Sequence, residues 1–235
     1  MIGKEIRSRA ALLALVCGLM VLAGCGDDNK EGDTGATGAT GATETGAEDD
    51  GGRCEAAEEP RPRRPRRTKP PSFRLDRNKT YIARVVTSCG TFEIELDSKD
   101  APRTGGSFVT LARKGFYDNV LFHRIVTGFV IQGGDPTGTG SGGPGYSIRE
   151  APPDDIVYSE GVAAMAKAGN EPAGTSGSQF FVVTNDSSLP PDYALLGRVK
   201  KGLDVVHAID LVPAGPDERP ISPVVIEKID IRVKD

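Results

Sequence analysis

Short runs of β-branched and aromatic residues, separated by turn-forming residues, recur along the chain from residue 81 to residue 233. Runs of this kind predict β-strands, because such side chains pack well on a pleated surface. Strands do not alternate regularly with helical segments, which argues against a parallel sheet with crossover helices. The 30 glycines and 17 prolines also suit many turns and little helix. The sequence therefore predicts a mainly β domain, either a barrel or a sandwich.

The runs predict a β-hairpin, six further strands and two short helices. The hairpin is expected because Ser88-Cys89-Gly90 separates the first two runs. The helices have apolar residues at helical spacing, and Gly115 should end the first of them. Strands are expected at 81–87, 91–96, 120–124, 129–132, 162–166, 179–183, 194–199 and 224–233, and helices at 102–113 and 203–209.

Residues 1–24 have the pattern of a lipoprotein signal peptide. A basic stretch precedes an apolar run at 10–23, which is shorter than the roughly 20 residues that a membrane-spanning helix needs. The run ends in Leu22-Ala23-Gly24-Cys25, which resembles a bacterial lipobox, where the chain is cut before the cysteine and the cysteine is acylated. An ordinary secretory signal is the alternative. We therefore predict lipidation of Cys25 and an extracytoplasmic, lipid-anchored location in the bacterial envelope.

Residues 25–78 are expected to form a lipidated, flexible linker. Residues 26–52 have almost no large apolar side chains, so they cannot bury enough surface to offset the entropy of ordering. Residues 60–71 are rich in proline and arginine and favour an extended polyproline path. This segment is interpreted as a stiff, solvated spacer, with contact to anionic lipid or envelope polymers as the alternative.

Two cysteines, Cys54 and Cys89, remain once Cys17 leaves with the signal and Cys25 carries lipid. An even pair in an exported protein is compatible with a disulfide bond. Two free thiols are the alternative, because the Cα separation that decides the matter cannot be read from the sequence.

Composition and motifs exclude several classes of protein. A formal net charge of −4 does not suggest a nucleic-acid binder, and two histidines are too few for a histidine-rich metal site. Residues 138–143 fit a G-x-G-x-x-G pattern, but Pro144 and Gly145 follow where a dinucleotide site needs a helix. We interpret the segment as a flexible loop and expect neither a metal nor a cofactor.

Two separated motifs carry the chemistry. Phe122–Asp135 places Arg124 among apolar and aromatic residues, with Gln132 eight positions later. Arginine stays charged and can donate hydrogen bonds, but it cannot act as a base, so this motif suits electrostatic stabilisation. The second motif combines Ala166-Lys167-Ala168-Gly169 with Gly177-Ser178-Gln179-Phe180-Phe181. Together the motifs closely resemble the cyclophilin family of peptidyl-prolyl isomerases, over roughly residues 80–233.

The resemblance implies a fold and a site. The implied domain, residues 79–235, is a closed eight-stranded antiparallel β-barrel capped by two α-helices. Arg124 would be the catalytic residue, donating to the proline nitrogen of a proline-containing polypeptide as the amide twists. The implied substrate-binding residues are His123, Phe129, Val130, Gln132, Ala166, Lys167, Ala168, Gln179, Phe181, Leu189 and Tyr193. His123 would either orient the site or simply pack.

Four positions depart from the pattern of this family. Val130 stands where methionine is common, Lys167 where asparagine is frequent, and Tyr193 where many members carry histidine. Ser188 replaces a frequent tryptophan, which the chain lacks altogether, and members without it tend to bind cyclosporin weakly. Substrate preference and inhibitor response are therefore expected to differ from the family norm.

We interpret the chain as a membrane-tethered, monomeric peptidyl-prolyl isomerase that assists proteins folding after export. The rival interpretation is a non-catalytic peptide-binding or chaperone module on the same barrel. A cell-wall scaffold anchored through residues 60–71 is a third possibility. Retention of Arg124, Phe129, Gln132 and Phe181 together favours the enzyme.

Overall fold

The structure is a computed structural model that describes residues 54–64 and 69–235. The predicted signal peptide, Cys25 and residues 26–52 of the linker lie outside the described residues, as do residues 65–68 of the arginine-rich segment. Within the described part of the chain, no helix has the length and apolar character needed to cross a membrane.

Eight antiparallel strands close into a barrel in the order β1-β10-β3-β4-β8-β6-β9-β2. Closure pairs both edges of every barrel strand and so leaves no free sheet edge. The strands are β1 (Thr80–Thr87), β2 (Gly90–Leu96), β3 (Val120–Val126), β4 (Val130–Gly133), β6 (Val162–Met165), β8 (Phe180–Val183), β9 (Leu195–Lys201) and β10 (Val225–Lys234). The prediction of a closed, mainly β barrel is confirmed.

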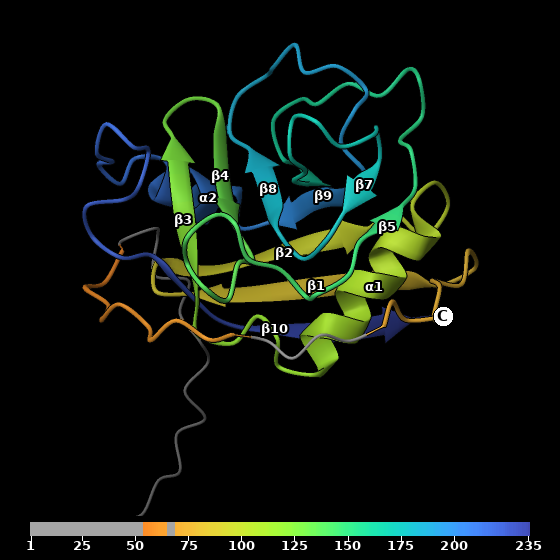
Figure 1. The fold of residues 1–235 in the computed structure, drawn as a ribbon, viewed down its shortest axis with the longest axis horizontal. Helices are drawn as coiled ribbons and strands as arrows, with labels where there is room; N and C mark the ends of the chain where they lie inside the picture. The colour runs from red at the N-terminus through yellow and green to blue at the C-terminus, as the bar shows by residue number, and fades with distance from the viewer. Residues whose placement is uncertain (1–53, 65–68) are drawn as a thin grey trace, which may run out of the picture. The chain divides into compact units, whose positions relative to one another are not determined.

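Two helices, α1 (Pro102–Arg113) and α2 (Leu203–Asp210), lie on opposite sides of the barrel, as Figure 1 shows. The carboxylate of Glu150 caps α1 by accepting hydrogen bonds from the backbone of Arg103 at 3.1 Å and of Thr104 at 2.7 Å. Gly115, with φ of 64°, follows the end of α1, as the sequence predicted. Both predicted helices are therefore present.

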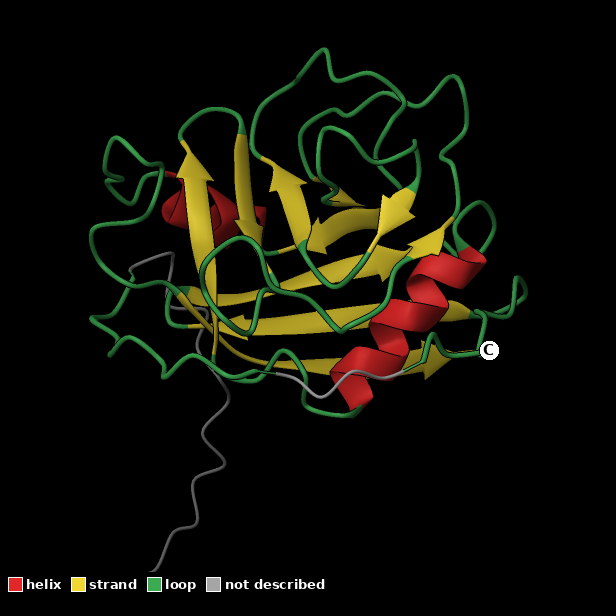
Figure 2. Ribbon diagram, viewed as in Figure 1, coloured by secondary structure: helices red, strands yellow, loops and turns green. Residues whose placement is uncertain are grey.

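A small second sheet pairs β5 (Ile148–Arg149) with β7 (Thr175–Ser176). The sequence did not predict these strands, because two residues are too few to show an alternating pattern. Long loops connect the strands between β4 and β9, and several of them extend from the top of the barrel in Figure 2. These loops supply much of the candidate site.

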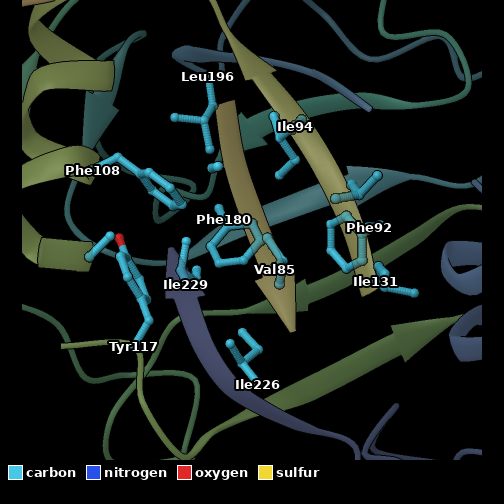
Figure 3. Packing of buried hydrophobic residues seen from close by; sticks show 14 of the residues in the cluster. Val85, Phe92, Ile94, Phe108, Tyr117, Ile131, Phe180, Leu196, Ile226 and Ile229 are labelled. Atoms are coloured by element: carbon cyan, nitrogen blue, oxygen red, sulfur yellow. The ribbon is translucent and has the colours of Figure 1, made fainter. Parts of the chain in front are cut away.

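The barrel interior is filled by large apolar side chains. Phe180 lies in the middle of the core, with ring centroids 5.6 Å from Phe108, 5.9 Å from Tyr117 and 6.2 Å from Phe122. All four rings are fully buried, and Figure 3 shows the packing around Phe180. Adjacent residues on a strand point to opposite faces, so Phe181 belongs to a second, outer cluster.

Residues 54–64, which we call the strap, lie against the barrel although the sequence assigned them to the linker. Cys54 forms a disulfide bond with Cys89, the pairing that the sequence left open. The backbone NH of Glu55 donates to Ser88 O at 2.8 Å. At the other end of the strap, the backbone NH of Arg63 donates to Pro136 O at 2.8 Å. The strap is thus attached at both of its ends.

Candidate active site

A β-bulge places Arg124 beside Gln132. In the pairing of β3 with β4, Phe122 lies opposite Gly133 and Arg124 opposite Gln132, so His123 is the extra residue. Nη1 of Arg124 donates to Oε1 of Gln132 at 3.3 Å. The Arg124 side chain is one-third exposed (33 %), so a substrate can reach it. Arg124, which follows the bulge, therefore carries its guanidinium on the outer surface of the barrel.

A chain of amide hydrogen bonds continues from Gln132 to a glycine-rich loop. Nε2 of Gln132 donates to Oε1 of Gln179 at 3.0 Å. Nε2 of Gln179 in turn donates to the carbonyl oxygens of Gly140 and Gly142, each at 2.9 Å. Arg124, Gln132 and Gln179 thus form one connected polar network, whose geometry is fixed at the loop end.

The loop at residues 137–142 folds around the buried carboxylate of Asp135. Oδ1 of Asp135 accepts from the backbone NH of Thr137 at 2.7 Å, and Oδ2 accepts from those of Thr139 at 3.1 Å and Gly142 at 3.0 Å. Burial alone would raise the pKa of Asp135, but the hydrogen bonds from Gly142 and Thr137 outweigh it and hold the pKa below its ordinary value. Asp135 ends the first sequence motif, but no role was predicted for it, although an aspartate that opens a loop rich in threonine and glycine is a known turn signal.

A cluster of apolar side chains lies next to this network, on the outer faces of β4, β6 and β8. Its aromatic wall pairs Phe181 with Tyr193, at 5.3 Å between ring centroids and 90° between ring planes. Burial raises the pKa of Tyr158 to about 12, so its hydroxyl stays protonated and donates to Tyr193 O at 2.6 Å. The structure brings together the predicted residues Phe129, Val130, Ala166, Phe181, Leu189 and Tyr193 in this cluster.

A cavity of 510 Å³ adjoins the polar network, and its lining includes Gln132, residues 166–168 and Gln179. Lys167 is one of the lining residues, but its ammonium already interacts with other residues of the chain. Its side chain is only 4 % exposed, with Nζ 3.6 Å from the carboxylate of Asp192 and 3.1 Å from Glu171 O. The ammonium also lies 5.6 Å from the centroid of the Tyr193 ring. Lys167 therefore braces the loops around the cavity.

His123 turns into the protein and is almost fully buried (8 % exposed). Neither ring nitrogen has a hydrogen-bond partner among the described residues. Burial lowers the pKa of His123 below its usual 6.5, and this effect outweighs the opposing charge of Asp135. A buried histidine of this kind, uncharged at neutral pH, fits the packing alternative.

We expect the stability of the chain to fall as the pH is lowered below 6.5, in part because of His123. The unfolded chain binds a proton on this residue at higher pH than the folded chain does, so its contribution is complete above pH 6.5 and declines toward the lower folded pKa. Urea unfolding at about pH 7.5 and 5.5 should show a smaller pH-dependence for His123→Leu than for the wild type. The control variant His207→Gln changes a half-exposed histidine and should retain the part of the pH-dependence that His123 causes. Equal slopes for His123→Leu and the wild type would contradict this assignment.

A cation that cannot act as a base, beside a cluster of apolar side chains, suits an enzyme that twists an amide without breaking a covalent bond, as a peptidyl-prolyl isomerase does. The chain belongs to the family described as cyclophilin type peptidyl-prolyl cis-trans isomerase/CLD, whose model matches residues 82–231. It is an enzyme of that class.

Similar proteins cover the same domain. The chain is 42 % identical over 151 residues to peptidyl-prolyl cis-trans isomerase-like 1 of Neurospora crassa, covering 61 % of this chain and 90 % of that protein. It is 43 % identical over 149 residues to peptidyl-prolyl cis-trans isomerase CYP18-2 of Arabidopsis thaliana, covering 60 % and 88 %.

Solved structures agree with the family assignment. A crystal structure of a cyclophilin type isomerase of Cryptosporidium parvum superposes with a TM-score of 0.62 at 31 % identity, covering 66 % of this chain and 99 % of that one. The same protein in the presence of the dipeptide Ala-Pro superposes with a TM-score of 0.60 at 33 % identity, covering 64 % and 98 %.

Proposed function

We propose that the chain isomerises X-Pro bonds in exported proteins and that Arg124 is its catalytic residue. The observation that carries the proposal is the position of Arg124, one-third exposed and hydrogen-bonded to Gln132, beside the outer apolar cluster. Uncatalysed rotation of the peptide bond has a barrier of about 18–20 kcal/mol. Each tenfold acceleration requires about 1.4 kcal/mol of transition-state stabilisation, so a few well-placed hydrogen bonds are enough.

The proposed mechanism is differential binding of the twisted amide. In the twisted state the proline nitrogen loses its conjugation and presents a lone pair, to which the Arg124 guanidinium donates. The planar cis and trans forms offer no such acceptor, so this interaction lowers the barrier without trapping either form. The proline ring packs against Phe129 and Phe181, and Gln132 binds the substrate backbone.

The test is isomerisation of an Ala-Pro peptide, followed by exchange NMR with the full chain present. The peptide is chosen because a similar structure was solved in the presence of Ala-Pro. We expect catalytic amounts of the chain to accelerate exchange between cis and trans. Binding of the peptide without acceleration would reject the catalytic proposal and favour the non-catalytic binding module.

Attachment to a membrane through lipid on Cys25 is part of the proposal. It is supported by the Leu22-Ala23-Gly24-Cys25 pattern. The disulfide bond between Cys54 and Cys89 adds support, because such bonds persist mainly in oxidising compartments. Proteins that fold in such a compartment would be the clients.

The Cys25→Ala variant should move from the membrane fraction to the soluble fraction when the full chain is expressed in a bacterium. The reason is the loss of the acyl chains, each of which contributes about 0.8 kcal/mol per buried methylene. Metabolic labelling with a fatty acid should mark the wild type and not the variant. Wild-type protein without label would contradict lipidation, whatever its fraction.

Contact of residues 60–71 with anionic envelope polymers is a further proposal, supported only by charge. Arg61 and Arg64 are exposed and carry this proposal. Arg63 is engaged by the barrel, since its Nη2 donates to Phe116 O at 2.9 Å and to Asp118 O at 2.5 Å.

A further inference from the structure

The guanidinium of Arg124 is held from the side of the loop that connects α2 to β10. Its Nε donates to Oε2 of Glu218 at 2.5 Å. Nη1 donates to Gln132 at 3.3 Å. No acceptor contacts Nη2 within the described residues, so its two N–H bonds remain available to a substrate. Glu218 thus holds the guanidinium at Nε, the nitrogen that joins the group to the rest of the side chain.

Glu218 has an uncommon backbone conformation. Its φ of 62° lies in the left-handed region, which residues other than glycine, asparagine and aspartate rarely adopt. Its NH donates to Gly215 O at 2.9 Å, and its carbonyl accepts from the NH of Ile125, the residue after Arg124, at 2.8 Å. A glycine would meet these backbone requirements with less strain, so the glutamate side chain itself needs an explanation. An observed outlier beside a reactive group supports a functional hypothesis.

The neighbouring residue ties the same loop to the strap. Nη2 of Arg219 lies 2.5 Å from the carboxylate of Glu59, and Nη1 donates to Gly138 O at 2.8 Å. A backbone bridge between Ala214 and Pro220 closes the loop on itself. The loop that carries Glu218 is therefore fixed by contacts to the strap, to Gly138 and within itself.

We propose that Glu218 is a positioning residue for Arg124, an inference that rests on the proposed catalytic role of Arg124. By accepting from Nε, the carboxylate sets the guanidinium plane so that Nη2 stays directed to the substrate. Glu218 also has an opposite effect, because a negative charge next to the arginine weakens the positive potential felt by the proline nitrogen. If positioning dominates, loss of the side chain slows the enzyme, and if charge compensation dominates, the loss speeds it up.

The experiment compares Glu218→Gly and Glu218→Gln in the full chain on an Ala-Pro peptide. Glycine accepts the left-handed backbone but removes the acceptor, so we expect kcat to fall roughly 10- to 100-fold with KM little changed. Glutamine keeps an acceptor for Nε without the charge and should restore most of kcat. The Tm of Glu218→Gly should equal or exceed that of the wild type, which separates positioning from a merely structural role. Asp217→Asn, in the same loop, is the matched control and should leave kcat unchanged.

Combining Glu218→Gly with Arg124→Ala tests whether one residue acts through the other. We expect the double variant to be no slower than Arg124→Ala alone. Multiplied effects, or a Glu218→Gly variant as fast as or faster than the wild type, would overturn the inference while leaving the slow Arg124→Ala variant, and hence the proposed function, intact. An Arg124→Ala variant as fast as the wild type would instead overturn the proposed function and this inference with it.

Discussion

We expect the Arg124→Ala variant to isomerise an Ala-Pro peptide roughly 100- to 1,000-fold more slowly than the wild-type chain, measured as kcat/KM. Alanine removes the donor that would stabilise the twisted amide. The planar ground state makes no such hydrogen bond, so most of the loss should appear in kcat and little in KM. Exchange NMR over a range of peptide concentrations separates the two parameters.

Two further variants serve as controls for the arginine. Arg124→Lys keeps the charge but lacks the planar fork that donates to several groups at once, so it should recover only part of the activity. Arg232→Ala removes an exposed arginine of β10 and should leave kcat/KM unchanged. Full activity in Arg124→Ala, with circular dichroism showing the native fold, would exclude Arg124 as the catalytic group.

Phe180→Ala should lower the free energy of unfolding by about 3–5 kcal/mol. Phe180 is fully buried and contacts three other aromatic rings, so its removal leaves a cavity that the closed barrel cannot easily collapse. Urea denaturation at neutral pH measures the effect. A loss below about 1 kcal/mol would show that the core relaxes around the cavity.

Phe181→Ala is the matched comparison, one residue along the same strand. Phe181 belongs to the outer cluster with Phe129 and Tyr193, so its truncation should weaken peptide binding as well as stability. We expect KM for the Ala-Pro peptide to rise in Phe181→Ala and to stay near the wild-type value in Phe180→Ala under conditions where both are folded. The reverse order would mean that the two faces of β8 are assigned wrongly.

The barrel strands could be predicted because alternation and turn residues are local signals. The faces of β8 could not, since Phe180 and Phe181 begin a run that is apolar on both sides. The resemblance assigned Phe181 to the substrate, and the structure supplies the geometry by placing it in the outer cluster. Neither pattern nor spacing revealed the bulge at His123, because the bulge depends on pairing with β4.

The contacts that hold the site together could not be predicted from the sequence, because they join residues that lie far apart along the chain. Glu218 lies 94 residues from Arg124 along the chain, and no motif marks it. The resemblance placed Lys167 at the substrate edge, but its long side chain is drawn to Asp192, which belongs to another loop. The structure gives the positions of the predicted substrate-binding residues, and their roles stay predictions.

The disulfide bond of the strap has a mechanical consequence. A pulling force applied to the chain before Cys54 passes through the sulfur atoms to Cys89, at the turn between β1 and β2. The intervening segment, with a sequence separation of 35 between the cysteines, is then bypassed by the load. Tension on a tether would therefore act on the barrel wall directly, and the contact between Glu59 and Arg219, in the loop that connects α2 to β10, would carry none of it.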